Sequence, residues 1–167
     1  MAINMQKNGK NHKINYEESL NYDNILKSRI EQRFKVLCVD TDRKSSQYAR
    51  ADGFLLKNKT IHSIAEYRCR YKYTYEHMKE KFKDCILTWD KVEKNRIVSE
   101  ILQIPFIFFI CIVPSDVFLY WKITNNKGEY IYKPIIDNTL ATRKSLSDST
   151  KVTKSNLHLL FTDATAF

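Results

Sequence analysis

The feature that most constrains the fold is the run of residues 106–113, FIFFICIV, which is almost wholly apolar. A strand with apolar residues on both faces is typical of the middle of a sheet that is covered on both sides. The wider apolar stretch, residues 104–113, is too short to span a bilayer and contains Pro105. We therefore expect a buried central strand, and neither a membrane segment nor a cofactor-binding segment, at this position.

The segments around this strand predict helices and strands in alternation. Between residues 16 and 34, Leu26, Ile30 and Phe34 lie near one helical face, and the short link at residues 57–59 suits a hairpin. The expected helices are 16–34, 75–82 and 90–103, and the expected strands are 34–40, 51–56, 60–69, 85–89, 106–113, 117–124 and 130–136. This order predicts an α/β fold, a three-layer sandwich with a central mixed sheet flanked by helices.

The chain of 167 residues is long enough for one domain with a sizeable hydrophobic core. Residues 1–15 are polar and carry three lysines, so we expect a flexible basic arm there. Residues 16–136 are expected to form the single domain. Residues 137–156 are rich in Ser, Thr and Lys and predict a loop, after which the apolar residues 157–161 dock back on the domain.

Composition excludes several kinds of site. The three glycines are not spaced as a P-loop or a Rossmann loop requires, and the histidines form no HxxxH pair, which argues against a helical zinc site. None of the four cysteines is in a CxxC pair, which favours buried thiols in a reducing compartment. With no apolar signal-peptide core near the N-terminus, an intracellular, cytoplasmic location is expected, without a membrane.

The net charge of +9 favours an anionic partner such as nucleic acid or an acidic lipid surface. One segment, residues 67–75 (YRCRYKYTY), contains three basic residues, four tyrosines and no acid. Basic side chains can bind phosphates, and tyrosines can stack on unpaired bases. The alternative is a solvated strand end with some tyrosines in the core. The candidate nucleic-acid-binding residues are Arg43, Lys44, Arg70, Tyr71, Lys72 and Lys91.

Two acidic residues lie on neighbouring strands of the expected hairpin. Asp52 begins one strand and Glu66 lies near the end of the next, so the hairpin brings the two carboxylates to one edge of the sheet. Carboxylate oxygens are ligands for Mg²⁺ or Mn²⁺, and Arg68, on the same face as Glu66, can offset their charge and orient a water molecule. The alternatives are a turn aspartate beside Gly53 and a surface ion pair between Glu66 and Arg68.

The pattern Asp52-Gly53 on one strand and Glu66-Tyr67-Arg68 on the next resembles the PD-(D/E)xK nuclease superfamily. The family's core order, α-β-β-β-α-β, matches the expected elements over residues 16–89. The resemblance implies a restriction-endonuclease-like fold and a metal-dependent endonuclease that hydrolyses phosphodiester bonds of DNA, less often of RNA. It makes Asp52 and Glu66 the ligands of Mg²⁺ or Mn²⁺, and it leaves a homodimer open.

The chain departs from the family motif because Arg68 occupies the position of the motif lysine. Arginine stays charged and cannot act as a general base, although it can orient water or stabilise phosphate charge. Lys91 or Lys72 could reach the site instead. The family often adds an acid from its first helix, for which Asp23 is the candidate and a surface carboxylate is the alternative; Glu17, Glu18 and Glu31 are further acids of that helix. The competing hypothesis for the whole chain is a catalytically inactive nuclease-fold protein that binds nucleic acid or an acidic protein partner.

Overall fold

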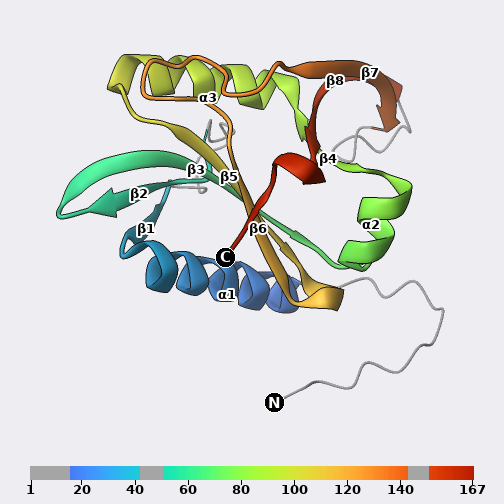
Figure 1. The fold of residues 1–167 in the computed structure, drawn as a ribbon, viewed down its shortest axis with the longest axis horizontal. Helices are drawn as coiled ribbons and strands as arrows, with labels where there is room; N and C mark the ends of the chain where they lie inside the picture. Colours follow the sequence, from blue (N-terminus) through green and yellow to red (C-terminus); the bar gives the residue numbers. More distant parts are fainter. Residues whose placement is uncertain (1–15, 42–50, 143–150) are drawn as a thin grey trace.

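Helices and strands alternate along the chain in the computed structural model, which describes residues 16–41, 51–142 and 151–167 (Figure 1). The helices are α1 (Tyr16–Phe34), α2 (Tyr75–Lys81) and α3 (Trp89–Leu102), with short 3₁₀ turns η1 (Val113–Ser115) and η2 (Phe161–Asp163). The strands are β1 (Leu37–Asp40), β2 (Gly53–Lys57), β3 (Thr60–Arg70), β4 (Asp84–Thr88), β5 (Phe106–Ile112), β6 (Val117–Lys122), β7 (Ile135–Thr142), β8 (Lys151–Leu160) and β9 (Thr165–Ala166). The basic arm expected at residues 1–15 lies outside the described residues.

The central sheet has six strands in the order β1-β2-β3-β5-β6-β9. β3 and β5 are parallel, with Tyr67 opposite Phe109, and the other neighbouring pairs are antiparallel, so the sheet is mixed. β5 pairs with a strand on each side, and six of its seven residues are buried. The prediction of a buried central strand is confirmed, because only a strand covered on both faces can be apolar on both.

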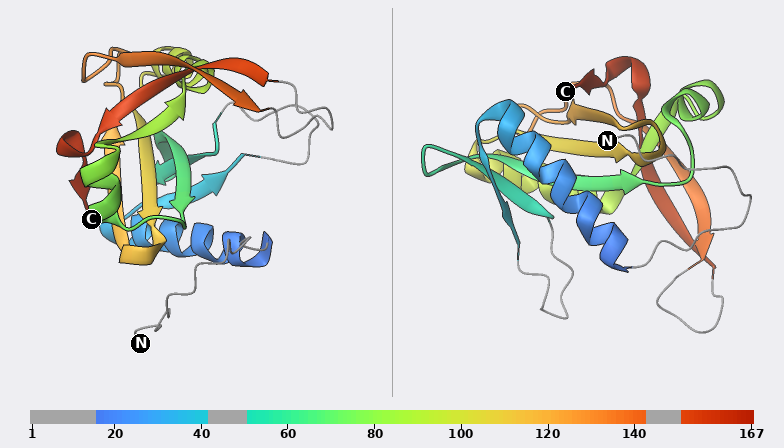
Figure 2. Two further views of the ribbon diagram at one scale, coloured as in Figure 1. Left: turned by 90° about the vertical axis from the view of Figure 1, so that its right-hand side faces the viewer. Right: turned by 90° about the horizontal axis from the view of Figure 1, so that it is seen from below.

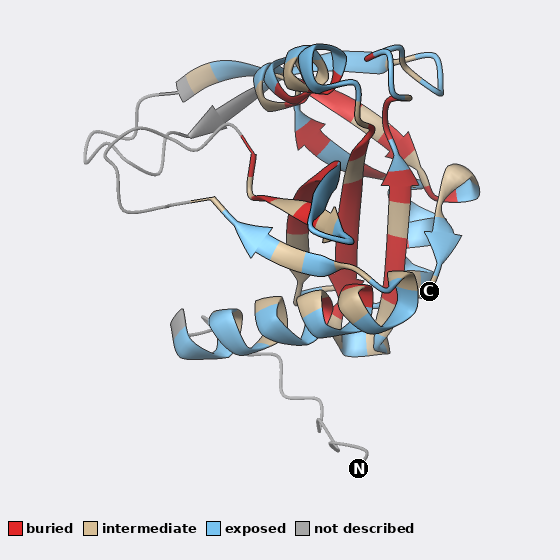
Figure 3. Cartoon of the chain, turned by 90° about the vertical axis from the view of Figure 1, so that its left-hand side faces the viewer, coloured by how far each residue is buried: buried red, intermediate tan, exposed pale blue. Residues whose placement is uncertain are grey.

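Helices cover the two faces of this sheet. α1 packs Leu26 and Ile30 against Ala65 and Phe109 on one face, and α3 covers the other face, where Val92 belongs to the larger cluster (Figures 1 and 2). Figure 3 shows buried residues concentrated on the strands between the helices. The predicted α/β class and mixed sheet are confirmed. In the described part of the chain, no helix is long and apolar enough to cross a membrane.

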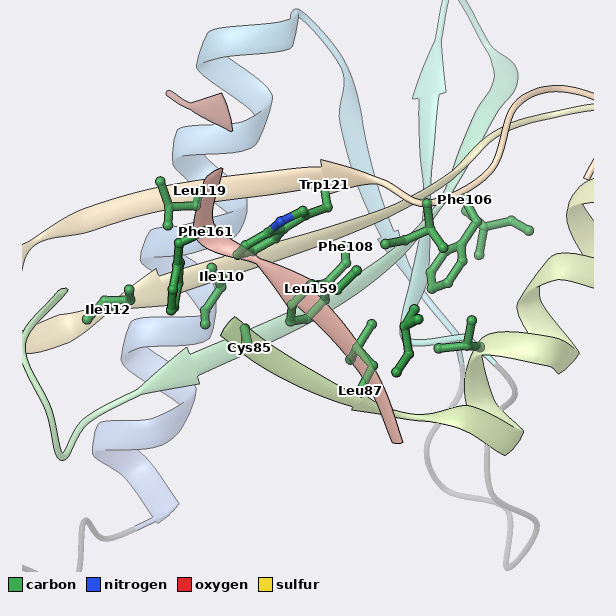
Figure 4. Close-up of a cluster of buried hydrophobic side chains, with 14 of the residues drawn as sticks. Cys85, Leu87, Phe106, Phe108, Ile110, Ile112, Leu119, Trp121, Leu159 and Phe161 are labelled. Carbon is green, nitrogen blue, oxygen red and sulfur yellow. The ribbon is translucent and has the colours of Figure 1, made fainter. Parts of the chain in front are cut away.

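A second sheet, in the order β4-β8-β7, packs on the α3 side. Its residues Cys85, Leu87, Leu159 and the following Phe161 belong to the same buried cluster as Trp121 and its neighbours, shown in Figure 4. Leu157 of β8 belongs to this cluster as well. The resemblance over residues 16–89 made β4 the last strand of the family's core order, and this match is wrong, because β4 lies in the second sheet and not beside β3.

The loop predicted for residues 137–156 is wrong where the structure describes it, because β7 and β8 pair along residues 135–142 and 151–158. These strands are rich in polar residues, and polar side chains pair across them: Ser155 donates a hydrogen bond to Asn138, and Asn156 to Thr139. The strand predicted at residues 130–136 is wrong for residues 130–134, where an isolated bridge joins Tyr130 to Thr124, and β7 begins only at Ile135. Sequence polarity favoured a loop, but the backbone ladder needs no apolar side chains on an exposed face.

Gly53 begins β2 and pairs with Asp40, the last residue of β1. A Cβ atom at this position would lie 2.6 Å from the carbonyl oxygen of Val39 and 3.2 Å from Cε2 of Tyr67. A side chain here would push β1 or the Tyr67 ring away from β2. The glycine therefore allows the close pairing that fixes the start of β2, immediately after Asp52.

Candidate functional site

The hairpin of β2 and β3 brings Asp52 and Glu66 together, as the sequence predicted. Gly53 pairs with Ala65, so Asp52, just before β2, lies beside Glu66 on β3. Both carboxylates bind one ammonium group: Nζ of Lys91 lies 3.0 Å from Oδ1 of Asp52 and 2.5 Å from Oε1 of Glu66. We call these three residues the acidic pair and its lysine.

Lys91 comes from the first turn of α3, the helix that connects the second sheet to the central strand β5. Its side chain is 30% exposed, whereas the Glu66 side chain is only 2% exposed. The sequence had offered Lys91 or Lys72 as a replacement for the motif lysine, and the structure brings Lys91 to the acidic pair. Fold topology, not sequence spacing, makes this choice.

Arg68 lies at the border of the site. Its Nη2 is 3.9 Å from Oε1 of Glu66, and its Nη1 donates a hydrogen bond of 3.3 Å to the carbonyl oxygen of Ile86 on β4. The side chain is partly exposed, so it can reach an anion in front of Glu66 while it remains anchored to the second sheet.

The two carboxyl groups have different electrostatic environments. Burial, followed by the negative charge of Asp52, raises the pKa of Glu66 to about 7. Burial would also raise the pKa of Asp52, but the charge and hydrogen bond of Lys91 and the Tyr67 N–H, 3.1 Å from Oδ2, together hold that pKa below its usual value. At neutral pH the site therefore contains one ionised carboxylate and one that exchanges a proton.

A buried acceptor is left over in this site. Within the described residues, Oε2 of Glu66 is buried and has no hydrogen-bond partner. A buried carboxylate oxygen without a donor is energetically costly, so such atoms call for a functional explanation. The acidic pair and its lysine thus combine two oxygen ligands, a titrating group and a cation, which suits binding of a metal ion or a proton transfer.

The buried Glu66 predicts how stability depends on pH. Its pKa is about 4.5 in an unfolded chain and about 7 in the folded protein, so the folded state binds more protons between these values, and stability falls as pH rises through this window. At 1.36 kcal/mol per pKa unit, this contribution amounts to roughly 3 kcal/mol. We expect Glu66→Gln to flatten the curve of unfolding free energy against pH, measured by urea denaturation between pH 4.5 and 8.

His158 provides the internal reference for that experiment. Its hydrogen bonds with Asp137 and Asp84 raise its pKa above 6.5, so the stability it contributes is present below pH 6.5 and is lost as pH rises through the raised pKa. The wild type and Glu66→Gln both retain the contribution of His158, so the difference between their curves of unfolding free energy against pH is due to Glu66. Parallel curves for the wild type and Glu66→Gln would show that Glu66 does not titrate in this window.

Asp23 lies on the opposite face of the sheet from the acidic pair. Its Oδ1 accepts a weak hydrogen bond from the Cys69 thiol, 3.5 Å away, on the face that α1 covers. Glu66 and Arg68 point to the other face, because alternate residues of a strand do so. The prediction that Asp23 joins the site is therefore wrong. Among the described residues, no three His, Cys, Asp or Glu side chains form a group that could hold a metal ion.

The other acids of α1 that the structure describes do not replace Asp23. Glu31 accepts a hydrogen bond of 2.8 Å from the backbone N–H of Cys38, and Glu17 and Glu18 lie in the first turn of the helix. No acid of this helix is therefore placed beside Asp52 and Glu66.

The predicted nucleic-acid-binding residues separate into two groups. Arg70 follows Glu66 and Arg68 on the same face of β3, and Lys72 is exposed with its Nζ 4.9 Å from the centre of the Tyr73 ring. Tyr71 instead packs edge-on against Tyr22 of α1, with ring centres 5.5 Å apart, so this ring serves the α1 interface. Arg43 and Lys44 lie outside the described residues.

Asn95 is a buried polar residue of α3 that the sequence analysis did not single out. It follows Lys91 by one helical turn, is fully buried, and neither polar atom of its amide has a partner among the described residues. Ser99, one turn further, is buried as well and donates a hydrogen bond to the carbonyl of Ile104. The sequence did contain a signal for this residue, because Lys91, Asn95 and Ser99 are spaced by four positions and so lie on one side of α3.

Comparison with protein-family models, with curated proteins and with solved structures found no match for this chain.

Proposed function

We propose that the chain is a Mg²⁺-dependent nuclease with a restriction-endonuclease-like core, acting on nucleic acid, in the first place DNA. The single observation that carries this proposal is the acidic pair on two adjacent strands, with one carboxylate buried and both bound to Lys91. The order α1-β1-β2-β3-α3-β5 supports it, since it follows the core order of the PD-(D/E)xK superfamily once α3 and β5 take the places that the resemblance assigned to α2 and β4.

The residues present fit a divalent metal ion. Asp52 and Glu66 offer carboxylate oxygens, the donors that Mg²⁺ prefers, and the buried Oε2 of Glu66 has no hydrogen-bond partner in the described part of the chain. A Mg²⁺ ion held there would supply activation of a water molecule and neutralisation of phosphate charge. Asp52, with its lowered pKa, offers a permanent negative charge to a cation, whereas Glu66 must first release its proton.

Lys91 takes the role that the motif lysine has in the resemblance. An ammonium group has three N–H donors, and two of them bind Asp52 and Glu66. The third is available to a phosphate oxygen or to the attacking water. Arg68, anchored on the carbonyl of Ile86, adds a second positive charge beside Glu66, which can stabilise the charge that develops on the phosphate.

A second candidate function is binding of nucleic acid without cleavage. The observation that favours it is the completeness of the ion pairing, because Lys91 already compensates both carboxylates without a metal ion. In that case the site is an internal ion pair that fixes α3 against β3, and Arg68, Arg70 and Lys72 provide the phosphate-binding surface.

Incubation with labelled single-stranded and duplex DNA and RNA, with Mg²⁺ or with EDTA, separates the two functions. The nuclease predicts cleavage that requires Mg²⁺. Salt-sensitive binding without cleavage in Mg²⁺ or Mn²⁺ supports the second function instead. Absence of both cleavage and binding at low salt contradicts both.

A further inference from the structure

A pocket of about 510 Å³ opens further along β3 from Glu66, where its lining begins at Cys69 and Arg70. It lies between the end of β3, helix α2 and the start of β4, and its walls include Arg70, Tyr73, Met78, Phe82, Cys85 and Ile86. Pockets of this size commonly hold small organic groups, and their walls are mostly apolar with a few polar groups that fix orientation. This pocket has that character.

Arg68 lies on β3 between Glu66 and Arg70, the latter of which lines the pocket. One of its guanidinium nitrogens faces Glu66, and another donates to the carbonyl oxygen of Ile86, which lines the pocket. Arg70 is the next residue on the same face of β3, about 7 Å further along the strand. A phosphate chain that crosses in front of Glu66 and follows β3 therefore passes Arg68 and reaches Arg70 at the pocket.

The pocket combines an aromatic surface with positive charge. Phe82 is 45% exposed and packs edge-on against Tyr73, with ring centres 5.2 Å apart. Arg70 hydrogen-bonds the Cys85 thiol in the wall of the pocket, while its buried Nε has no hydrogen-bond partner among the described residues. The acid of the pocket, Asp84, is paired with His158 at 2.8 Å, so it offsets less of the charge of Arg70 and Lys72.

We infer that this pocket takes an unpaired nucleobase of the strand whose phosphodiester lies at the acidic pair. The base contacts Phe82 and the apolar wall, and Arg70 and Lys72 bind the phosphate of the same nucleotide. This inference rests on the proposed function and narrows its substrate to single-stranded nucleic acid or to a strand with an unpaired segment. A paired base cannot enter, since the pocket would have to hold both partners of the pair.

The test measures binding in EDTA, where no metal-dependent cleavage occurs. The probe is a labelled DNA single strand of about 12 nucleotides, compared by fluorescence anisotropy with a strand of equal length in which the central bases are replaced by abasic sites. We expect the wild type to bind the strand with bases about tenfold more tightly, the effect of stacking one base. Phe82→Ala is expected to remove most of this ratio, and Phe82→Trp to retain it.

Tyr132→Ala is the matched control, because Tyr132 is also partly exposed but does not line the pocket. Equal affinity of the wild type for both strands overturns the inference without any variant, and an unchanged ratio in folded Phe82→Ala overturns it as well. Cleavage without base-dependent binding contradicts the proposed nucleobase site but not the proposed nuclease function. Base-dependent binding without Mg²⁺-dependent cleavage contradicts the nuclease function but not the nucleobase site.

Discussion

Asp52→Asn is expected to lower the rate of Mg²⁺-dependent cleavage by about three orders of magnitude. A bound metal ion contributes several kcal/mol of transition-state stabilisation, and each 1.36 kcal/mol corresponds to a factor of ten in rate. The substitution removes a negative charge that Lys91 and the Tyr67 N–H keep ionised. Single-turnover cleavage of a labelled strand at saturating protein measures the rate.

Asp90→Asn is the control for this loss. Asp90 adjoins Lys91 in the sequence, but its carboxylate is exposed and pairs with Lys94, 2.6 Å away. We expect a change in rate of less than about twofold, since exposed ion pairs contribute little. If Asp52→Asn cleaves as fast as Asp90→Asn, cleavage does not take place at the acidic pair.

Lys91→Met is expected to cause the largest loss of stability, about 3 kcal/mol at pH 8. Removing one partner of a buried ion pair costs 3–5 kcal/mol, and the partial exposure of Lys91 places this case at the lower end. The substitution leaves two negative carboxylates together, one of them buried. Urea denaturation measures the difference in unfolding free energy.

The pH dependence of this loss follows from Glu66. Without the ammonium group, the pKa of Glu66 rises further. The folded variant then binds a proton that the unfolded chain does not bind, which stabilises the folded state as the pH falls. The loss of unfolding free energy relative to the wild type is therefore smaller at pH 5 than at pH 8. Added Mg²⁺ should raise the melting temperature of Lys91→Met more than that of the wild type, because no ammonium competes for the oxygens.

Lys94→Met is the matched control, since Lys94 lies on the same helix and pairs with an exposed acid. The unfolding free energy of Lys94→Met should lie within about 0.5 kcal/mol of that of the wild type. Equal stability of the two variants at pH 8 would show that Lys91 does not compensate a buried charge. A deficit that is independent of pH would point to lost packing instead.

Local patterns predicted much of the core. The strand at residues 106–113 could be recognised because every position is apolar, and the hairpin of β2 and β3 because a short polar link separates two apolar runs. The hairpin itself brings Asp52 close to Glu66, so both candidate metal ligands could be predicted. Their exact pairing could not, because a β-bulge between Leu55 and Leu56 shifts the register by one residue. Their burial could not be predicted, since it depends on α3 and the second sheet.

Other parts depend on contacts between distant segments. The polar residues of β7 and β8 show no apolar alternation, and only their mutual backbone pairing makes them strands. Helical periodicity does not specify which side of the sheet α1 covers. The structure places α1, and with it Asp23, on the face opposite to Glu66.

The sequence by itself determined a mixed, doubly covered sheet with two carboxylates on one hairpin, because strand alternation and hairpin length are local properties. Only the tertiary structure decided which cation joins them. Lys91 follows Glu66 by 25 positions and reaches it because α3 crosses back over β3 before β5 pairs with that strand.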